Sequence, residues 1–301
     1  MADKEKTTEI VKDTTSEEKT TKIAKDKTEE ERKEIEEKIK TLVPMDDILF
    51  IKLAGHNDFC CEMLRVFLND PNIEVCSNKP QVKLVNFQGR SVILDLECKL
   101  SDGSIVAVEV QKANNDDHQR RVRYNSSLLT INRTETGIDF KDIPNIISIF
   151  ISSFDVFKLG CTIYKVKHFA ECKGKLIALD NGLQEIYVNS AYCDEDDSTV
   201  SKLMRVFSEK NYNDHELFPR TTELKRQYTQ TEEGIVCMRD IIAELLEGSR
   251  EKIFQEGKQE GKQESLIEVA KNMLKDKETV ERISRITKLP YEQIEKLCIS
   301  D

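Results

Sequence analysis

The stretch that decides the fold is Ser91–Gln111, with the sequence SVILDLECKLSDGSIVAVEVQ. It contains two runs rich in Val, Ile and Leu, Val92–Leu100 and Ser104–Gln111, on either side of Ser101–Gly103. Apolar β-branched runs separated by a short turn signal containing Asp-Gly are typical of a β-hairpin. The stretch therefore predicts two paired antiparallel strands.

Both predicted strands carry carboxylates among their apolar residues, Asp95 and Glu97 in the first and Glu109 in the second. A carboxylate in such a run is costly to bury unless it is paired or holds a cation. With a two-residue turn, Asp95 and Glu109 would lie on opposite faces of the hairpin. With a three-residue loop ending in a left-handed Gly103, they would face each other with Cβ atoms about 4.5–5.5 Å apart, and Gln111 would share their face. The second register is the geometry of a site for Mg²⁺, which prefers oxygen ligands, whereas an ordinary strand pair would leave the acids facing solvent.

The sequence around these acids continues as LDLEC-LSDGS---VEVQKA-NDDHQRRVRYNSS, and its core runs from Asp95 to Asn125. This pattern resembles the PD-(D/E)XK nuclease family transposases, also called recombination-promoting nucleases, and the resemblance extends over residues 44–235. It implies that Asp95 and Glu109 bind Mg²⁺ or Mn²⁺, with the backbone carbonyl of Val110 as a further ligand. Gln111 stands where the superfamily usually has a Lys, and this branch commonly carries that Glu-x-Gln form.

The resemblance also implies a fold and an activity. The fold is α/β, a PD-(D/E)XK restriction-endonuclease-like core in which helices flank a mixed sheet, with a helical C-terminal arm. The activity is that of a metal-dependent DNA endonuclease, a phosphodiester hydrolase in which Gln111 orients the attacking water or contacts the scissile phosphate. The alternative is a catalytically weak or inactive module, derived from a nuclease, that binds DNA or another protein. The change of Lys to Gln at position 111 permits this alternative.

A predicted helix over residues 118–131 follows a capping run, Asn114–Asp117. Guanidinium groups suit phosphate binding, and an aromatic residue among basic residues is typical of a nucleic-acid face. The predicted DNA-contacting residues are Lys112, His118, Arg120, Arg121, Arg123 and Tyr124. Arg120 or Arg123 is expected to supply the positive charge that Gln111 lacks. The spacing also allows pairing within the helix, Asp116 with Arg120 and Asp117 with Arg121, but the resemblance to the family's H..R.RYN pattern favours a functional face.

Two earlier helices are expected, one opening at Asp46-Asp47 and one over residues 58–68. The first resembles the family's DD..F.K opening. The second carries Glu62, which has two interpretations: an extra acidic ligand, as some members of the superfamily have, or an exposed acid in a salt bridge. Further strands are expected at residues 81–88, 145–153, 162–169, 176–179 and 184–189, a helix at 198–208, and a polar lid or linker at 222–233.

The chain divides into four predicted parts. Residues 1–43 are highly charged and contain no aromatic residue, so they predict a disordered tail that can be removed with little effect on folding. Residues 44–234 form the nuclease-like domain. Residues 235–275 form a long helical, coiled-coil-like arm with an EGKQ repeat, which is expected to form a homo-oligomer. Residues 276–301 form a small helical module.

Composition sets further limits. The net charge of −10 gives no overall basic field, so DNA binding must rely on a local basic surface. No apolar run is long enough to span a membrane and no signal-peptide pattern opens the chain, so we expect a cytoplasmic protein without membrane contact. The nine cysteines include no C-x-x-C pair, which indicates reduced thiols and not a disulfide framework.

Overall fold

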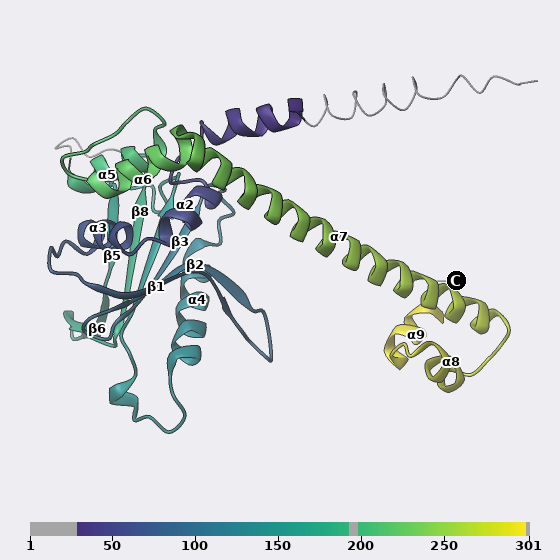
Figure 1. Ribbon diagram of the computed structural model, residues 1–301. Helices are drawn as coiled ribbons and strands as arrows, with labels where there is room; N and C mark the ends of the chain where they lie inside the picture. The colour runs from purple at the N-terminus through teal and green to yellow at the C-terminus, as the bar shows by residue number, and fades with distance from the viewer. Residues whose placement is uncertain (1–28, 193–197, 299–301) are drawn as a thin grey trace, which may run out of the picture. The chain divides into compact units, whose positions relative to one another are not determined.

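The computed structural model describes residues 29–192 and 198–298, without the side chains of residues 246–265 and 298. The chain divides into two compact units, Met1–Arg239 and Asp240–Asp301. Each unit has its own secondary structure (Figure 1).

The first unit is built on a six-stranded mixed sheet with the strand order β1-β2-β3-β4-β8-β5. The strands are β1 (Val75–Leu84), β2 (Val92–Leu100), β3 (Ile105–Gln111), β4 (Ile146–Ser152), β8 (Leu183–Asn189) and β5 (Ile163–Val166). The first three strands are antiparallel, β3, β4 and β8 are parallel, and β5 is antiparallel to β8. This arrangement, flanked by helices, confirms the predicted α/β class.

The predicted hairpin is present, and it has the three-residue loop. Leu96 pairs with Val108 and Glu97 pairs with Ala107. The Leu100 N–H donates to the Ser104 carbonyl at 2.9 Å, and Gly103 has φ +88. Glycine adopts that left-handed conformation without the steric cost that a side chain brings, so Gly103 favours this loop and the register that goes with it.

Helices cover both faces of the sheet. They are α2 (Asp47–Ala54), α3 (Asn57–Leu68), α4 (His118–Arg133), α5 (Thr199–Ser208) and α6 (Pro219–Gln230). Cys98 of β2 contacts Cys60 of α3, whereas its neighbour Glu97 bonds Arg133 of α4. Because successive strand residues point to opposite faces, α3 and α4 lie on opposite sides of β2.

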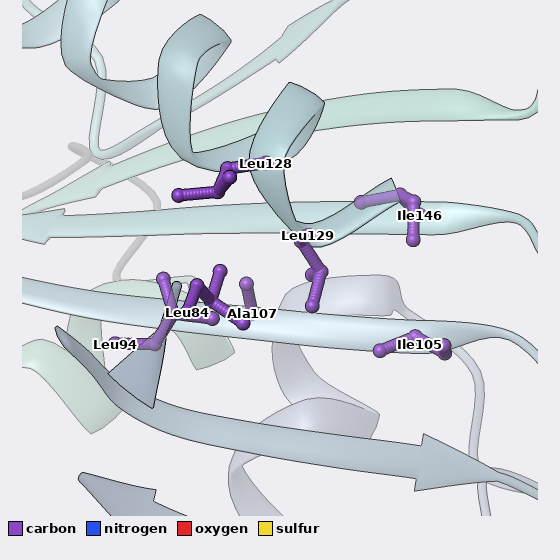
Figure 2. Close-up of a cluster of buried hydrophobic side chains, with 7 residues drawn as sticks. All are labelled: Leu84, Leu94, Ile105, Ala107, Leu128, Leu129 and Ile146. Atoms are coloured by element: carbon purple, nitrogen blue, oxygen red, sulfur yellow. The ribbon is translucent and has the colours of Figure 1, made fainter. Parts of the chain in front are cut away.

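Helix α4 is held against the sheet by buried aliphatic side chains. Leu128 and Leu129 of α4 lie over side chains from four strands (Figure 2). The buried members from the strands are Leu84, Leu94, Ile105, Ala107 and Ile146. This packing fixes the rotation of α4, and with it the direction in which the predicted DNA-contacting residues point.

Three predicted elements differ from the structure. The strand expected at residues 81–88 ends at Leu84 and begins earlier, at Val75. The run at 162–169 is split between β5 and β6 (His168–Cys172), and β6 pairs with β7 (Lys175–Leu179) in a separate two-stranded sheet. The expected polar lid at 222–233 is mostly helix α6, which buries Lys225 beneath three backbone carbonyls of residues 206, 209 and 212.

The expectation of a removable tail through residue 43 also needs correction. Residues 29–39 form a helix, and Ile39 is 0% exposed. Arg239 donates to Glu36 of this helix at 3.1 Å. The packed part of the chain therefore includes residues before 44, while residues 1–28 lie outside the described part.

The second unit contains most of α7 (Glu232–Lys275), followed by α8 (Val280–Thr287) and α9 (Tyr291–Cys298). Its buried core consists of Ala270, Ile283, Leu289 and Ile294. The EGKQ repeat lies within α7, in the part whose side chains are not described. Among the described residues, no helix is long and apolar enough to cross a membrane.

Candidate active site

Asp95 sits where the two hairpin strands part. The pairing of β2 with β3 ends at Leu96 and Val108. Beyond that point the Val110 N–H donates to Oδ2 of Asp95 at 2.8 Å. A backbone N–H at this depth needs an acceptor, and the carboxylate supplies it. The side chain of Asp95 is thereby fixed beside β3.

Glu109 is the second carboxylate, and it lies one strand away on β3. Asn125 of α4 donates from Nδ2 to Oε1 of Glu109 at 3.2 Å. Burial, followed by the negative charge of Asp95, raises the pKa of Glu109 to about 8. Burial also raises the pKa of Asp95 to about 6, and the carboxylate of Asp47 adds to this rise. Both acids therefore favour the protonated form when no cation is near.

Arg121 of α4 is a cation whose charge acts on both acids. Its Nη1 donates to Oε1 of Gln111 at 2.9 Å. Its charge lowers the pKa of both Asp95 and Glu109, against the larger effect of burial. Gln111 and Arg121 together therefore place an amide and a guanidinium beside the two acids.

Two other predicted acids lie apart from this site. Glu97 accepts hydrogen bonds from Arg133, with Nη2 to Oε2 at 2.6 Å. Glu62 accepts from the backbone N–H groups of Arg220 and Thr221 at 3.1 and 2.8 Å, at the beginning of α6. Glu62 thus caps a helix, which neither interpretation from sequence had foreseen.

The six predicted DNA-contacting residues have different surroundings. Lys112 forms an ion pair with Asp46 and borders a pocket of about 260 Å³. His118 is 5% exposed, with ring centroids 4.7 and 5.3 Å from Phe154 and Phe150, and burial lowers its pKa. It therefore supports the start of α4 as a neutral side chain.

The remaining four residues lie further along α4. Arg120, Arg121 and Tyr124 line a second pocket, of about 530 Å³, which reaches Glu109. Arg123 is exposed on the same helix. Arg121 also approaches Asp117 at 3.5 Å, so pairing within the helix exists beside its contact with Gln111. The residue that bonds Gln111 is thus Arg121, whereas the expectation that Arg120 or Arg123 supplies the positive charge at the phosphate stays a prediction.

The donor chemistry of the site fits a hard divalent cation. The two carboxylates offer oxygen ligands and carry raised pKa values that a cation would relieve. Within the described residues no group of three or more His, Cys, Asp or Glu side chains could hold a metal ion. The protein would supply two acids and leave the other positions to water and substrate, the usual pattern for Mg²⁺.

Comparison with protein families gives a match to the PD-(D/E)XK nuclease family transposases over residues 44–195. The matched region covers half of the chain and includes every strand and helix that forms the site. The chain belongs to this family. Comparison with curated proteins and with solved structures gave no match. Membership makes the domain a nuclease-like, transposase-type domain of the hydrolase class.

Two side chains that act on the acids of this PD-(D/E)XK site were not singled out from the sequence as part of it. Asn125 bonds Glu109, and Asp47 raises the pKa of Asp95. Both lie in stretches that resemble the family, Asn125 at the end of H..R.RYN and Asp47 in the DD..F.K opening. The signal was present in the sequence, but it did not show that these side chains act on the acids.

Proposed function

We propose that this PD-(D/E)XK domain is a metal-dependent DNA endonuclease, with Asp95 and Glu109 as ligands of Mg²⁺ or Mn²⁺. The observation that carries the proposal is the pair itself: two carboxylates held on adjacent strands, both with raised pKa values. A pair of acids kept in this state has little structural purpose, because Asn and Gln would pack there without repulsion. The carbonyl of Val110, next to Asp95, is the further ligand in this proposal.

The roles of the chain's own residues follow from their contacts. Asp95 is oriented by the Val110 N–H, and Glu109 by Asn125. A bound divalent cation supplies an acidified water and stabilises charge on phosphate oxygens. The pocket that reaches Glu109 gives a DNA strand access to this end of the pair.

Gln111 and Arg121 share the task of the usual motif Lys in this proposal. Arginine is only a donor, so the amide oxygen of Gln111 faces Arg121, and the amide NH₂ remains to contact a phosphate. Arg121 adds the positive charge that Gln111 lacks, beside the site where charge develops on the phosphate. This pairing supports contact with the scissile phosphate over orientation of the water.

Plasmid cleavage tests the proposal. Purified protein is incubated with supercoiled plasmid and Mg²⁺ or Mn²⁺, beside Asp95→Asn and Glu97→Gln. The wild type and Glu97→Gln should nick or cut the plasmid, and Asp95→Asn should not. Glu97 is the matched control because it lies on the same strand and bonds Arg133, away from the pair.

Thermal unfolding of the same proteins separates metal binding from catalysis. A cation that binds only the folded state should stabilise the wild type by about 2.7 kcal/mol at 100 times its dissociation constant. Stabilisation without cleavage would favour the nuclease-derived binding module. If Glu97→Gln lost the metal response while Asp95→Asn kept it, the metal would be bound by Glu97 and not by Asp95, and the proposed ligand would be wrong.

A further inference from the structure

The loop that joins β1 to β2, residues 85–91, lies beside the site and has no role in the proposed chemistry. It borders the 530 Å³ pocket that reaches Glu109. One wall of this pocket is formed by Arg90, Val92 and Ile93, and the facing wall by Arg120 and Tyr124 of α4. A strand entering the site through this pocket must pass the loop.

The loop is ordered by hydrogen bonds. The Tyr124 hydroxyl donates to the carbonyl of Arg90 and accepts from Nδ2 of Asn86 at 3.0 Å. Asn86 Oδ1 accepts from the Gln88 N–H at 3.0 Å, and the Asn86 N–H donates to Ser91 Oγ at 3.1 Å. The conformation between Asn86 and Ser91 is therefore fixed from within and from α4.

This ordered loop presents Phe87 to solvent, with 96% of the residue exposed. Ile93 is also 55% exposed, and Tyr124 is 37% exposed. Holding a phenyl ring in water on a fixed loop gains nothing for folding, since the ring buries no apolar area. Phe87 itself does not line the pocket, but Arg90 and Ser91 of the same loop do, so its ring is available to a ligand that extends from the pocket along this loop.

The charges beside this apolar surface define the ligand. Arg90, Arg120 and Arg121 line the pocket against the acids Glu109 and Asp117. Guanidinium groups bind phosphate, and aromatic rings stack on bases. Only unpaired bases offer their faces, because those of a duplex are stacked on each other. A nucleic-acid strand with unpaired bases matches both features, because its phosphates suit the guanidinium groups and its bases suit the exposed aromatic rings.

We infer that the β1–β2 loop binds unpaired nucleotides of a DNA strand, so that the substrate carries a single-stranded or extruded segment beside the scissile phosphate. The inference rests on the proposed function for the position of that phosphate. Phe87 stacks on an unpaired base, Arg90 and Arg120 contact the backbone, and Tyr124 positions the loop through its hydroxyl.

Binding without metal tests this inference independently of catalysis. Fluorescence anisotropy in EDTA compares a labelled single strand with the matching blunt duplex, for wild type, Phe87→Ala and Phe140→Ala. Phe140, in the short helix η1 (Phe140–Asp142), is the matched control because it is 93% exposed and no residue of η1 lines the pocket, whereas Arg90 and Ser91 of the loop that carries Phe87 do. Both substitutions alter exposed rings, so both proteins should keep the wild-type melting temperature.

The wild type should bind the single strand more tightly than the duplex. Phe87→Ala should weaken single-strand binding by roughly 5- to 150-fold, the usual loss for one stacked base, while Phe140→Ala leaves it unchanged. Equal binding of both DNAs, no binding of either, or an unchanged affinity in Phe87→Ala would overturn the inference. If the wild type shows this binding pattern but does not cleave plasmid with Mg²⁺ or Mn²⁺, the result would count against the proposed nuclease activity alone. Cleavage with no effect of Phe87→Ala on binding would count against the loop alone.

Discussion

Asp95 and Glu109 are two buried acids whose protonation is linked to folding. Their pKa values in the folded protein, about 6 and about 8, lie above the ordinary values of 3.8 and 4.5. The folded state therefore binds more protons than the unfolded state between about pH 4 and pH 8. This contribution destabilises the metal-free fold progressively as the pH rises through that window, and it is absent below it.

The corresponding prediction concerns Asp95→Asn in EDTA. The mutant should be at least as stable as the wild type at pH 8, and its advantage should shrink as the pH falls toward 4, because protonation then removes the repulsion in the wild type. Urea unfolding at a series of pH values measures the difference between the two proteins. Glu97→Gln is the control for a bonded acid on the same strand. A difference that stays constant with pH would contradict the linkage.

At the residue scale, the sequence was enough to predict that the two acids share a face of the hairpin. It was not enough to predict which residue of α4 bonds Gln111. Both acids and Gln111 lie on one hairpin, where alternation and a turn containing Gly103 determine which residues share a face. Arg120 and Arg121 are successive residues of a helix, about 100° apart around its axis. Which of them meets Gln111 depends on the rotation of α4, which is set by Leu128 and Leu129 against the sheet. No local pattern contains that information.

At the scale of elements, Glu62 joins α3 to α6. Its two oxygens accept the backbone N–H groups of Arg220 and Thr221, which have no acceptor within their own helix. Glu62→Ala should therefore lower the free energy of unfolding by about 1 kcal/mol, the usual loss for a helix cap, and leave the metal response intact.

Asp58→Ala is the matched control for Glu62. Asp58 lies on the same helix and also faces α6, but its 3.2 Å ion pair with Arg220 is half-exposed. Such pairs contribute about 0–1 kcal/mol. Urea unfolding with and without Mn²⁺ measures both effects. If Glu62→Ala abolished the metal response while keeping the stability, Glu62 would be a ligand and the interpretation as a cap would be wrong.

The elements that sequence reasoning misplaced share a physical cause. Strand β1 begins with Val75 but continues through a polar stretch that includes Pro80, which is tolerated because β1 lies at the edge of the described sheet. Helix α6 buries Thr221, Thr222 and Lys225, so its inner face lacks the apolar spacing that marks an amphipathic helix. The hairpin, α4 and β4 follow the expected patterns, and those were predicted.

At the scale of the whole molecule, the extent of the packed unit can be tested at Ile39. Ile39→Ala should lower the free energy of unfolding by about 2–5 kcal/mol, because it removes a fully buried side chain. Ile131→Ala is the control, since Ile131 is 70% exposed on α4. Thermal or urea unfolding measures both changes. If both substitutions lowered the free energy of unfolding by equal, small amounts, the folded domain would begin near residue 44, as expected from the sequence.

The predicted role of the C-terminal arm in oligomerisation stays a prediction, as does the division at residues 235 and 276. The structure divides the chain at Asp240, inside α7, because the last helices pack on the end of α7 around their own core. Sequence patterns marked each helix of that unit. They could not show which residues of a long helix belong to which core, because this depends on tertiary contacts.

The order of the site residues along the chain has a consequence for how the protein folds. Asp95, Glu109, Gln111, Arg121 and Asn125 all lie on β2, β3 and α4, which follow one another directly. The parallel pairs of β3 with β4 and of β4 with β8 join segments much further apart, so their formation must close longer loops. We therefore expect the two acids to meet early in folding, before β4 and β8 join β3. A divalent cation present at that stage would act as a nucleus for the fold as well as a ligand of the finished protein.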